Sequence, residues 1–390
     1  MAKIYFDYAS ASPVDARVIE AMLPYLSESF GNPISIHSFS REPKKAVEEA
    51  RSKVAELIGA DKAREIIFTS GATESINLAI KGVGFRNRDE GNHIITTKIE
   101  HMSTLNSCKY LSKFGFQVTY LPVDKYGIPD LEELKNTITD KTILISISYA
   151  NGEIGTLMPV RAIAEIAGDE EIPLHVDATA ACGKVEIEVS RENISLLSIS
   201  SNDIYGPKGV GALYVKDGTR IEPILHGGGQ ERGLRSGSEN VASIAGFGKA
   251  AEIAKAEMKQ ESERLKKLRD KLIKGVLTSI PESYLNGHPT QRLPNNAHFR
   301  FSYIEGESII LSLDMHGIAA ASGSACTSLT LEPSHVLLGI GLKHEEAHGS
   351  LLFTLGRWNI EEEVDLVLSI LPGVIKKLRA TSPLTPRELR

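Results

Sequence analysis

The sequence predicts an α/β protein, with a mixed, mostly parallel sheet flanked by helices in a large domain and a smaller α+β domain beside it. Between about residues 50 and 220, short β-branched runs alternate with helical patterns, which is typical of parallel βαβ units. At 390 residues the chain is longer than one hydrophobic core usually supports, so two domains are expected. A charge-laced helical pattern from Ala242 to about Ile280 predicts one long helix that connects them.

The predicted strands of the large domain follow one another along the chain. Glu65–Ser70 precedes a glycine turn and a helical pattern, and the later strands repeat this arrangement. In such sheets ligands bind at the carboxyl ends of the strands, so we expect a site in the loops that follow them. The other predicted strands are His93–Glu100, Thr142–Ala150, Pro173–Ala180, Leu196–Ser200 and Gly211–Val215.

Composition and charge argue against several classes of protein. A hydrophobic content of 42% and a charged content of 24% are ordinary for a globular chain, and a net charge of −6 gives no basic surface for nucleic acid. No apolar run is long enough to span a membrane, and the N-terminal segment becomes polar too early for a signal peptide. The three cysteines are too scattered for a disulfide framework. We therefore expect a cytoplasmic protein without a nucleic-acid or membrane partner.

Two polar features follow predicted strands. Ser70–Glu74 lies between a strand and a helix, where the N–H groups of Gly71 and Ala72 and the hydroxyl of Thr73 can cradle an anion. An ordinary helix cap would have the same sequence. Asp177 ends another strand, where a carboxylate either caps the next turn or pairs with the protonated nitrogen of a pyridine ring.

Ten motifs, in the same order along nearly the whole chain, resemble those of cysteine desulfurases of the IscS/NifS type. Those proteins are pyridoxal-phosphate enzymes of the class V aminotransferase family that remove sulfur from L-cysteine. The resemblance implies a pyridoxal-phosphate transferase of fold type I that forms a homodimer, with a large cofactor domain over residues 16–256 and a small domain over 1–15 and 257–390. The motifs are GNPISIH, FTSGATES, KIEHMS, NGEIG, HVDAT, IYGPKGVGALYV, HGGGQERGLRSGS, ASGSACTS, LEPSHVL and FTLGR.

The resemblance also implies which side chains hold the cofactor. Thr73 and Ser200 would bind the phosphate, together with Ser238 of the partner subunit. Asp177 would pair with the pyridine nitrogen, and His101 would stack on the ring as a catalytic residue. Taken alone, His101 would more simply be a capping or core histidine, and only its KIEHMS context favours the role at the ring.

Five positions depart from the family pattern, and all are expected to face one cavity. The family's Ser-Gly-His-Lys-Ile-Tyr is Ser-Ser-Asn-Asp-Ile-Tyr here, so Asp203 replaces the lysine that forms the Schiff base and Asn202 replaces a histidine that contacts the phosphate. Ala180 replaces a glutamine that binds the phenolic oxygen, and Gly152 replaces an asparagine that contacts the cofactor. Leu352 replaces an arginine that grips the substrate carboxylate. Neutral drift in an active enzyme is the competing explanation.

A carboxylate cannot form an imine, so Asp203 removes the covalent attachment of the cofactor. Lys208 lies further along the chain, but the family's Gly-Pro-Lys-Gly has that lysine in addition to the catalytic one. We expect pyridoxal phosphate or pyridoxamine phosphate to be held without a covalent bond. The ammonium of pyridoxamine phosphate can hydrogen-bond to a carboxylate at position 203.

Ala321–Ser328 is a run of small residues that suits a loop presenting the thiol of Cys326. In the desulfurases the matching cysteine takes sulfur as a persulfide and carries it to an iron–sulfur scaffold protein. This loop keeps the family pattern, so Cys326 is predicted to handle sulfur or to be a ligand of an Fe–S cluster shared with an IscU-like scaffold. Cys108 and Cys182 are expected to be inert, packed side chains.

His344–His348 matches the H-E-x-x-H pattern of zinc proteases. Gly349 and Ser350 follow at once, no third ligand is evident in the sequence, and the family has an ordinary surface turn at this place. Zinc hydrolysis is therefore not the prediction.

Three functional hypotheses remain open from the sequence. The first is a desulfurase-fold protein of iron–sulfur cluster assembly that handles sulfur through Cys326 and has weak or absent turnover of L-cysteine. The second is an active cysteine desulfurase that uses another base or another lysine. The third is a cofactor-loaded regulatory or assembly subunit of another desulfurase.

Overall fold

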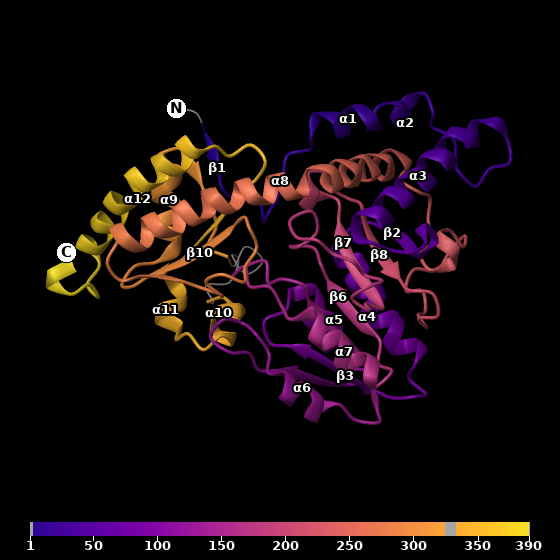
Figure 1. The fold of residues 1–390 in the computed structure, drawn as a ribbon, viewed down its shortest axis with the longest axis horizontal. Coiled ribbons are helices and arrows are strands. Elements are labelled where there is room, and N and C mark those ends of the chain that lie inside the picture. Colours follow the sequence, from indigo (N-terminus) through magenta and orange to yellow (C-terminus); the bar gives the residue numbers. More distant parts are fainter. Residues whose placement is uncertain (1–2, 324–332, 390) are drawn as a thin grey trace.

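Two lobes joined by one long helix make up the molecule (Figure 1). The structure is a computed structural model that describes residues 3–323 and 333–389. Helix α8, Val241–Ser279, runs along both lobes, close to the predicted bounds of 242 and 280. In the part of the chain that the structure describes, no helix combines the length and the apolar character that a membrane span requires.

The larger lobe is built on a seven-stranded sheet with the strand order β2-β8-β7-β6-β5-β3-β4. Strands β7, β6, β5, β3 and β4 run parallel to one another, whereas β8 is antiparallel to both β7 and β2. The predicted fold class, a mixed and mostly parallel sheet, is confirmed. The strands are β2 (Ile66–Thr69), β3 (His93–Thr97), β4 (Gln117–Leu121), β5 (Thr142–Ser148), β6 (Leu174–Asp177), β7 (Leu196–Ser200) and β8 (Gly211–Val215).

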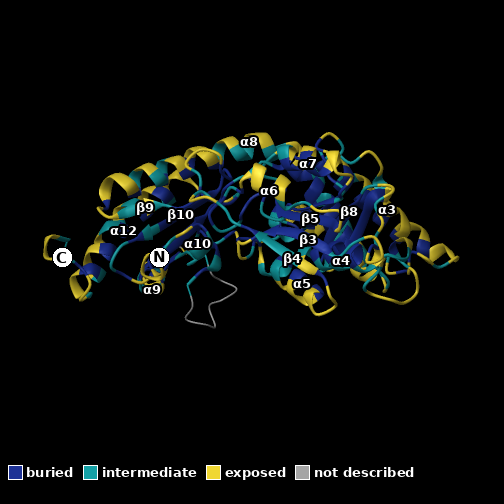
Figure 2. Cartoon of the chain, turned by 90° about the horizontal axis from the view of Figure 1, so that it is seen from below, coloured by how far each residue is buried: buried dark blue, intermediate teal, exposed yellow. Residues whose placement is uncertain are grey.

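The sheet is buried on both faces because helices cover it (Figure 2). Helix α3 packs along α8, and α4 packs on α5 and on several strands. Only the outer faces of these helices are exposed, which agrees with their mixed apolar and charged sequences. The helices of this lobe are α1 (Ala16–Met22), α2 (Pro24–Ser27), α3 (Arg41–Ile58), α4 (Ala72–Arg86), α5 (Met102–Ser112), α6 (Leu131–Thr137) and α7 (Val160–Asp169).

The smaller lobe combines segments from both ends of the chain. Strand β10 (Asn296–Phe301) lies between β9 (Ser283–Leu285) and β12 (Ser350–Thr354), and both neighbours are antiparallel to it. The N-terminal strand β1 (Ile4–Tyr5) pairs in parallel with β11 (Ile318–Ala319). A core that includes Phe6, Phe299 and Phe353 fills this lobe. Its helices are α9 (Gly306–Asp314), α10 (His335–Gly339), α11 (His344–His348) and α12 (Glu361–Thr381).

The sequence missed strand β4 and overextended several other strands. The segment Gln117–Leu121 is only partly buried at the sheet edge, so it lacks the continuous apolar pattern of the central strands. The predicted strand His93–Glu100 ends at Thr97, and Pro173–Ala180 ends at Asp177, because the polar residues beyond turn into the loops of the site. Helix α11 is a short helix that ends at His348, with Gly349 as its C-cap directly before β12.

Candidate active site at the carboxyl edge of the sheet

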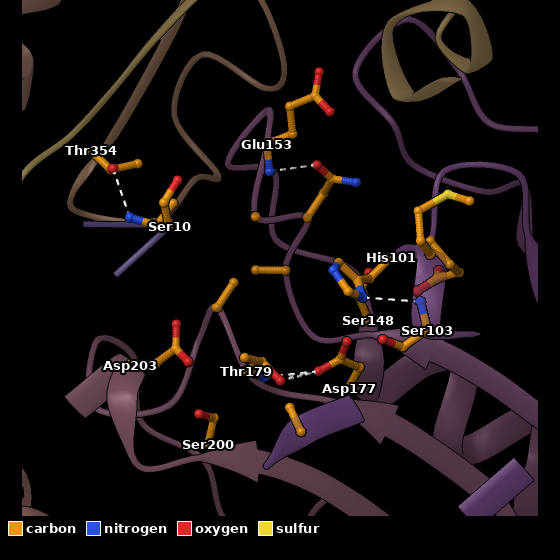
Figure 3. Close-up of a pocket in the computed structure, with 18 of the residues that line it drawn as sticks. Ser10, His101, Ser103, Ser148, Glu153, Asp177, Thr179, Ser200, Asp203 and Thr354 are labelled. Atoms are coloured by element: carbon orange, nitrogen blue, oxygen red, sulfur yellow. Dashed lines mark hydrogen bonds between the residues drawn. The ribbon is translucent and has the colours of Figure 1, made fainter. Parts of the chain in front are cut away.

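A cavity of about 600 Å³ lies between the two lobes, at the carboxyl ends of the parallel strands. The ends of β5, β6 and β7 meet there, since Ser148 is paired with Asp177 and Asp177 with Ser198. The smaller lobe closes the cavity with Leu352 and Thr354 of β12. Figure 3 shows side chains from both lobes that point into this space.

The predicted anion cradle is one wall of the cavity. Helix α4 begins at Ala72, and its N-cap Gly71 has φ 151° and ψ 176°, a conformation that is essentially restricted to glycine. Ser70, Gly71, Ala72 and Thr73 all line the cavity. The N–H groups of the first helical turn have no partner within the helix, so they are available to an anion. The hydroxyls of Thr73 and Ser103 lie 3.1 Å apart and join the starts of α4 and α5.

Asp177 is held by Thr179. Its Oδ1 accepts hydrogen bonds from the Thr179 backbone N–H at 3.0 Å and from the Thr179 hydroxyl at 2.6 Å (Figure 3). The side chain therefore caps the turn after β6 and also lines the cavity, so both sequence interpretations hold at once. A carboxylate fixed in this way suits a protonated pyridine nitrogen.

His101 caps helix α5 and also lines the cavity. Its Nδ1 accepts the backbone N–H of Ser103 at 3.1 Å, so in the neutral ring the proton is on Nε2. This hydrogen bond fixes the orientation of the imidazole beside Asp177 and Ser148 (Figure 3). The capping role and the predicted place at the cofactor ring are therefore compatible.

Two functional neighbours of His101 were missed in the sequence. Glu100 is fully buried and accepts the Thr97 hydroxyl at 2.7 Å, and burial, aided by the nearby negative charge of Asp177, raises the pKa of Glu100 to about 8. His335 lies at the start of α10 and donates from Nε2 to the Glu100 carbonyl oxygen at 2.9 Å. Both lie inside the KIEHMS and LEPSHVL motifs, but only tertiary structure shows that they meet.

The positions that depart from the family pattern all line the cavity. A Cβ atom placed on Gly152 would lie 3.4 Å from the Cβ of Ala180, so these two small residues face each other. Leu352 is 3% exposed and presents an apolar wall. Asn202 uses its Oδ1 to accept the Ser12 N–H at 3.3 Å, which ties it to the N-terminal segment.

Asp203 lies in the 3-10 helix Asn202–Ile204, directly after β7, with its carboxylate turned into the cavity near Ser200 (Figure 3). Burial raises the pKa of Asp203 to about 6, while the positive charge of Lys184 and the Ser200 hydroxyl oppose that rise. Lys208 is directed away: its Nζ donates to the Ser12 carbonyl oxygen at 2.9 Å. Among the described residues that line the cavity, Lys184 is the only lysine.

The structure describes the residues on either side of the predicted cysteine loop. Cys326 lies outside the described residues, but Gly323 before it and Ser334 after it both line the cavity. Cys108 and Cys182 are buried, which confirms that they are packed side chains, and burial raises the pKa of both thiols to about 12, which disfavours the reactive thiolate. Ser238 is exposed and does not line the cavity of its own chain.

These residues fit a pyridoxal-phosphate group. The N-terminus of α4, with Gly71 as its N-cap, and the hydroxyls of Thr73 and Ser200 suit its phosphate. The carboxylate of Asp177 suits its ring nitrogen, and His101 lines the part of the cavity that would hold the ring. The fold and this arrangement define a pyridoxal-phosphate-dependent protein of fold type I. Consistently, the model of the class V aminotransferases matches residues 4–367.

Similarities to individual proteins indicate which group within this family the chain resembles. Cysteine desulfurase IscS 1 of Archaeoglobus fulgidus is 59% identical over 383 residues, which is 98% of this chain and 100% of that protein. A solved structure titled NifS-like protein has a TM-score of 0.90 at 38% identity and covers 96% of this chain and 100% of its own. Another, titled SspA in complex with cysteine, has a TM-score of 0.82 at 35% identity, with 92% and 100% covered. The chain belongs to the cysteine desulfurases of the IscS type, a family whose cofactor is pyridoxal phosphate.

Proposed function

We propose that this chain serves iron–sulfur cluster assembly by handling sulfur through Cys326 and docking an IscU-like scaffold, with weak or absent desulfuration of L-cysteine by itself. The observation that carries the proposal is Asp203, a carboxylate in the cavity wall. The sequence resemblance implies an imine-forming lysine at this position. A cytoplasmic location fits this role, because a reducing compartment keeps a thiol available.

With Asp203 at this position the cofactor cannot be attached through an imine, while the rest of the cavity still suits the cofactor. When bound, pyridoxal phosphate supplies an electron sink for bonds to the substrate's α-carbon. Gly71–Thr73 would hold its phosphate and Asp177 its ring nitrogen, but position 203 has no amine that could hold its aldehyde. We therefore propose non-covalent binding, with pyridoxamine phosphate favoured because its ammonium meets a carboxylate.

Leu352 is expected to weaken the binding of the substrate carboxylate in the same cavity. An apolar side chain, 3% exposed, lies where the family places a guanidinium for the substrate carboxylate. Loss of a charged hydrogen-bond partner costs about 1.5–3 kcal/mol of binding energy, so L-cysteine should bind at least tenfold more weakly than in an arginine-bearing relative.

Sulfur handling by Cys326 does not need the imine. Its thiolate can attack the outer sulfur of a donor persulfide, so that a new persulfide forms on Cys326 and the donor leaves as a thiolate. Alternatively, the thiolate can be one ligand of a cluster held by the scaffold, since thiolates are the preferred ligands of Fe–S clusters. Gly323 and Ser334, the described residues that flank this segment, both line the cavity between the lobes, which supports a role for Cys326 at this cavity.

We also propose a homodimer. The segment between α1 and α3 exposes large apolar side chains that the single chain leaves uncovered, among them Leu26 at 64%, Phe30 at 67% and Phe39 at 63%. Clusters of this kind mark protein interfaces. A second copy would also bring its own Ser238 loop, which in this chain lies away from the cavity.

The second candidate is an active cysteine desulfurase, and the third is a regulatory or assembly subunit of another desulfurase. L-alanine and persulfide formed from L-cysteine in the presence of added pyridoxal phosphate, and lost in Cys326→Ala, would favour the second. The third requires that the chain raises the turnover of another desulfurase regardless of Cys326.

The experiment for the first candidate has three readouts on the purified protein. Mass spectrometry should find pyridoxamine or pyridoxal phosphate released by denaturation, with no lysine adduct after borohydride. Incubation with a persulfide donor should add one sulfur atom to Cys326. Capture of an IscU-type scaffold should depend on Cys326 when an Fe–S cluster is present, with Cys108→Ala as the matched control. A borohydride-stable adduct on any lysine would overturn the proposal.

A further inference from the structure

Lys184 places an amine in the wall of the cavity, directly against the residue that replaced the family lysine. Its Nζ donates a hydrogen bond to the main-chain carbonyl oxygen of Asp203 at 3.2 Å. Lys184 lines the same cavity as Asp203, Asp177 and Ser200.

The backbone holds Lys184 firmly. The segment after β6 forms a helical turn in which Cys182 N–H donates to the Ala178 carbonyl oxygen at 2.8 Å and Val185 N–H to that of Ala181 at 3.1 Å. From the long helix α8, the Ser262 hydroxyl donates to the Lys184 carbonyl oxygen at 2.6 Å. The lysine is therefore positioned by two elements that are independent of Asp203.

Several groups face the Asp203 carboxylate. Asp177 at the end of β6 adds negative charge, and the Ser200 hydroxyl at the end of β7 is a hydrogen-bond donor. The thiol of Cys182 is neutral because burial raises its pKa to about 12. From helix α8, the uncharged Ser262 bonds to the Lys184 carbonyl oxygen. Burial lowers the pKa of the Lys184 amine and the negative charge of Asp203 opposes that change, so Lys184 and Asp203 favour each other's charged form.

Lys184 contacts the main chain of Asp203 and not its carboxylate. Its ammonium bonds to the carbonyl of the 3-10 turn, whereas the carboxylate of Asp203 points into the cavity, toward the space near Thr179 (Figure 3). A ligand that enters the cavity therefore meets the carboxylate first. An ionised carboxylate attracts an ammonium and repels electron-rich oxygen, whereas a protonated one distinguishes them poorly.

We propose that Lys184 is the positioning residue of Asp203: it fixes the turn that carries Asp203 and keeps the carboxylate ionised, so that the cavity prefers the aminated cofactor to the aldehyde. This inference rests on the non-covalent cofactor binding proposed above. It assigns to Lys184 a role in choosing the chemical form of the cofactor.

Equilibrium dialysis of the full-length protein tests the proposal, with pyridoxamine phosphate and pyridoxal phosphate measured separately between about pH 5 and 9. The phosphate of both ligands titrates near pH 6, so the ratio of the two affinities removes that contribution. The ratio should rise in favour of pyridoxamine phosphate with a midpoint near 6, the pKa of Asp203. Asp203→Asn should abolish that rise, because it removes the titrating carboxylate.

Lys184→Met should move the midpoint up by about one pH unit or more and lower the ratio at pH 7 by about twofold for a shift of one unit and up to about tenfold for two. Lys184→Arg should restore the wild-type midpoint, since it restores the charge. Lys208→Met is the matched control, because that lysine bonds to Ser12 and should leave the midpoint unchanged. Thermal unfolding of each variant reports whether it is folded.

The possible failures can be told apart. If the wild-type protein binds neither ligand, the proposed cofactor binding fails. If it binds both but Lys184→Met and Lys184→Arg share the wild-type midpoint, the role of Lys184 fails alone. A borohydride-stable pyridoxyl adduct on Lys184 itself would overturn both, because the amine would then hold the aldehyde directly.

Discussion

Gly152 and Ala180 face each other in the cavity wall, close enough that a Cβ on Gly152 would touch the Cβ of Ala180 at 3.4 Å. They come from different loops, after β5 and after β6. The two positions where the sequence resemblance implies polar cofactor contacts therefore lie side by side. Both residues line the cavity, so a longer side chain at either position would extend into it.

Ala180→Gln should therefore strengthen cofactor binding. A glutamine at this position regains one hydrogen bond of about 0.5–1.5 kcal/mol, so the affinity for pyridoxamine phosphate should rise roughly twofold to tenfold. Ala180→Met is the control, because it has similar length but no amide. Fluorescence titration measures both, and an equal gain from methionine would show that filled volume, not the hydrogen bond, is responsible.

Gly71→Ala should weaken phosphate binding. Nothing lies within 4 Å of a Cβ at Gly71, so the substitution acts through its φ of 151°, which an alanine adopts only with strain. We expect a stability loss of about 1 kcal/mol or more and an affinity loss of about tenfold for either phosphate cofactor.

Gly115→Ala is the matched control for Gly71. Gly115 has a φ of 88° with open space around a Cβ, and it lies between α5 and β4, away from the cavity. Thermal unfolding should detect a comparable loss in both variants, while dialysis should detect weaker binding in Gly71→Ala alone. Unchanged affinity in Gly71→Ala would contradict the cradle.

Glu100→Gln should flatten the pH dependence of stability. Burial raises the pKa of Glu100 from 4.5 to about 8, so the folded protein keeps a proton that the unfolded chain releases. Between these two values this group lowers the free energy of unfolding by about 1.4 kcal/mol for each unit of rising pH. Denaturant unfolding at several pH values should show a slope that is steeper in the wild type than in the variant by about 1.4 kcal/mol for each pH unit, since Glu153, whose pKa burial also raises to about 8, contributes to both. Glu56→Gln, on the exposed side of α3, should keep the wild-type slope.

Leu352→Arg should improve the binding of L-cysteine. The backbone of Leu352 is bonded to Ala321 in both directions, so the side chain can change without loss of the bridge. A guanidinium facing the cavity can pair with the substrate carboxylate, and affinity should rise about tenfold or more. Calorimetry with L-cysteine and with cysteamine, which lacks the carboxylate, separates this contact from general charge. A gain for both ligands would argue against carboxylate recognition.

The sequence predicted the central elements well because their signals are local. Strands β7 and β8 were predicted with their observed bounds, since each is a short apolar run between turn residues. The motif residues Thr73 and Asp177 were placed at strand ends, and the structure brings them into one cavity. These features can be predicted from the order of residues along the chain alone.

The missed features depend on tertiary contacts. Lys184 is nineteen residues before Asp203, and only the packing of β6 beside β7 brings their loops together. Glu100 is an ordinary glutamate in the sequence, and its raised pKa arises because both lobes bury it. Strand β8 is antiparallel to β7, to which a short connection joins it. The hydrophobic periodicity of the sequence does not indicate the direction of a strand.

Asp203→Lys should convert the cavity into one that holds pyridoxal phosphate covalently. The introduced amine would lie near Lys184, and the mutual repulsion of two ammonium groups lowers the pKa of the new amine and favours its reaction with the aldehyde. Borohydride treatment followed by peptide mass spectrometry should find the pyridoxyl adduct at position 203. Asp203→Met, which has similar length but no amine, should give none.

Restored attachment should not by itself restore full turnover, because Leu352 still leaves the substrate carboxylate without a cation. Asp203→Lys should therefore release little L-alanine from L-cysteine, and adding Leu352→Arg should raise that rate at least tenfold. An adduct without any turnover in the double variant would place the remaining defect at Gly152 or Ala180. Efficient turnover in Asp203→Lys alone would show that the arginine position is dispensable in this cavity.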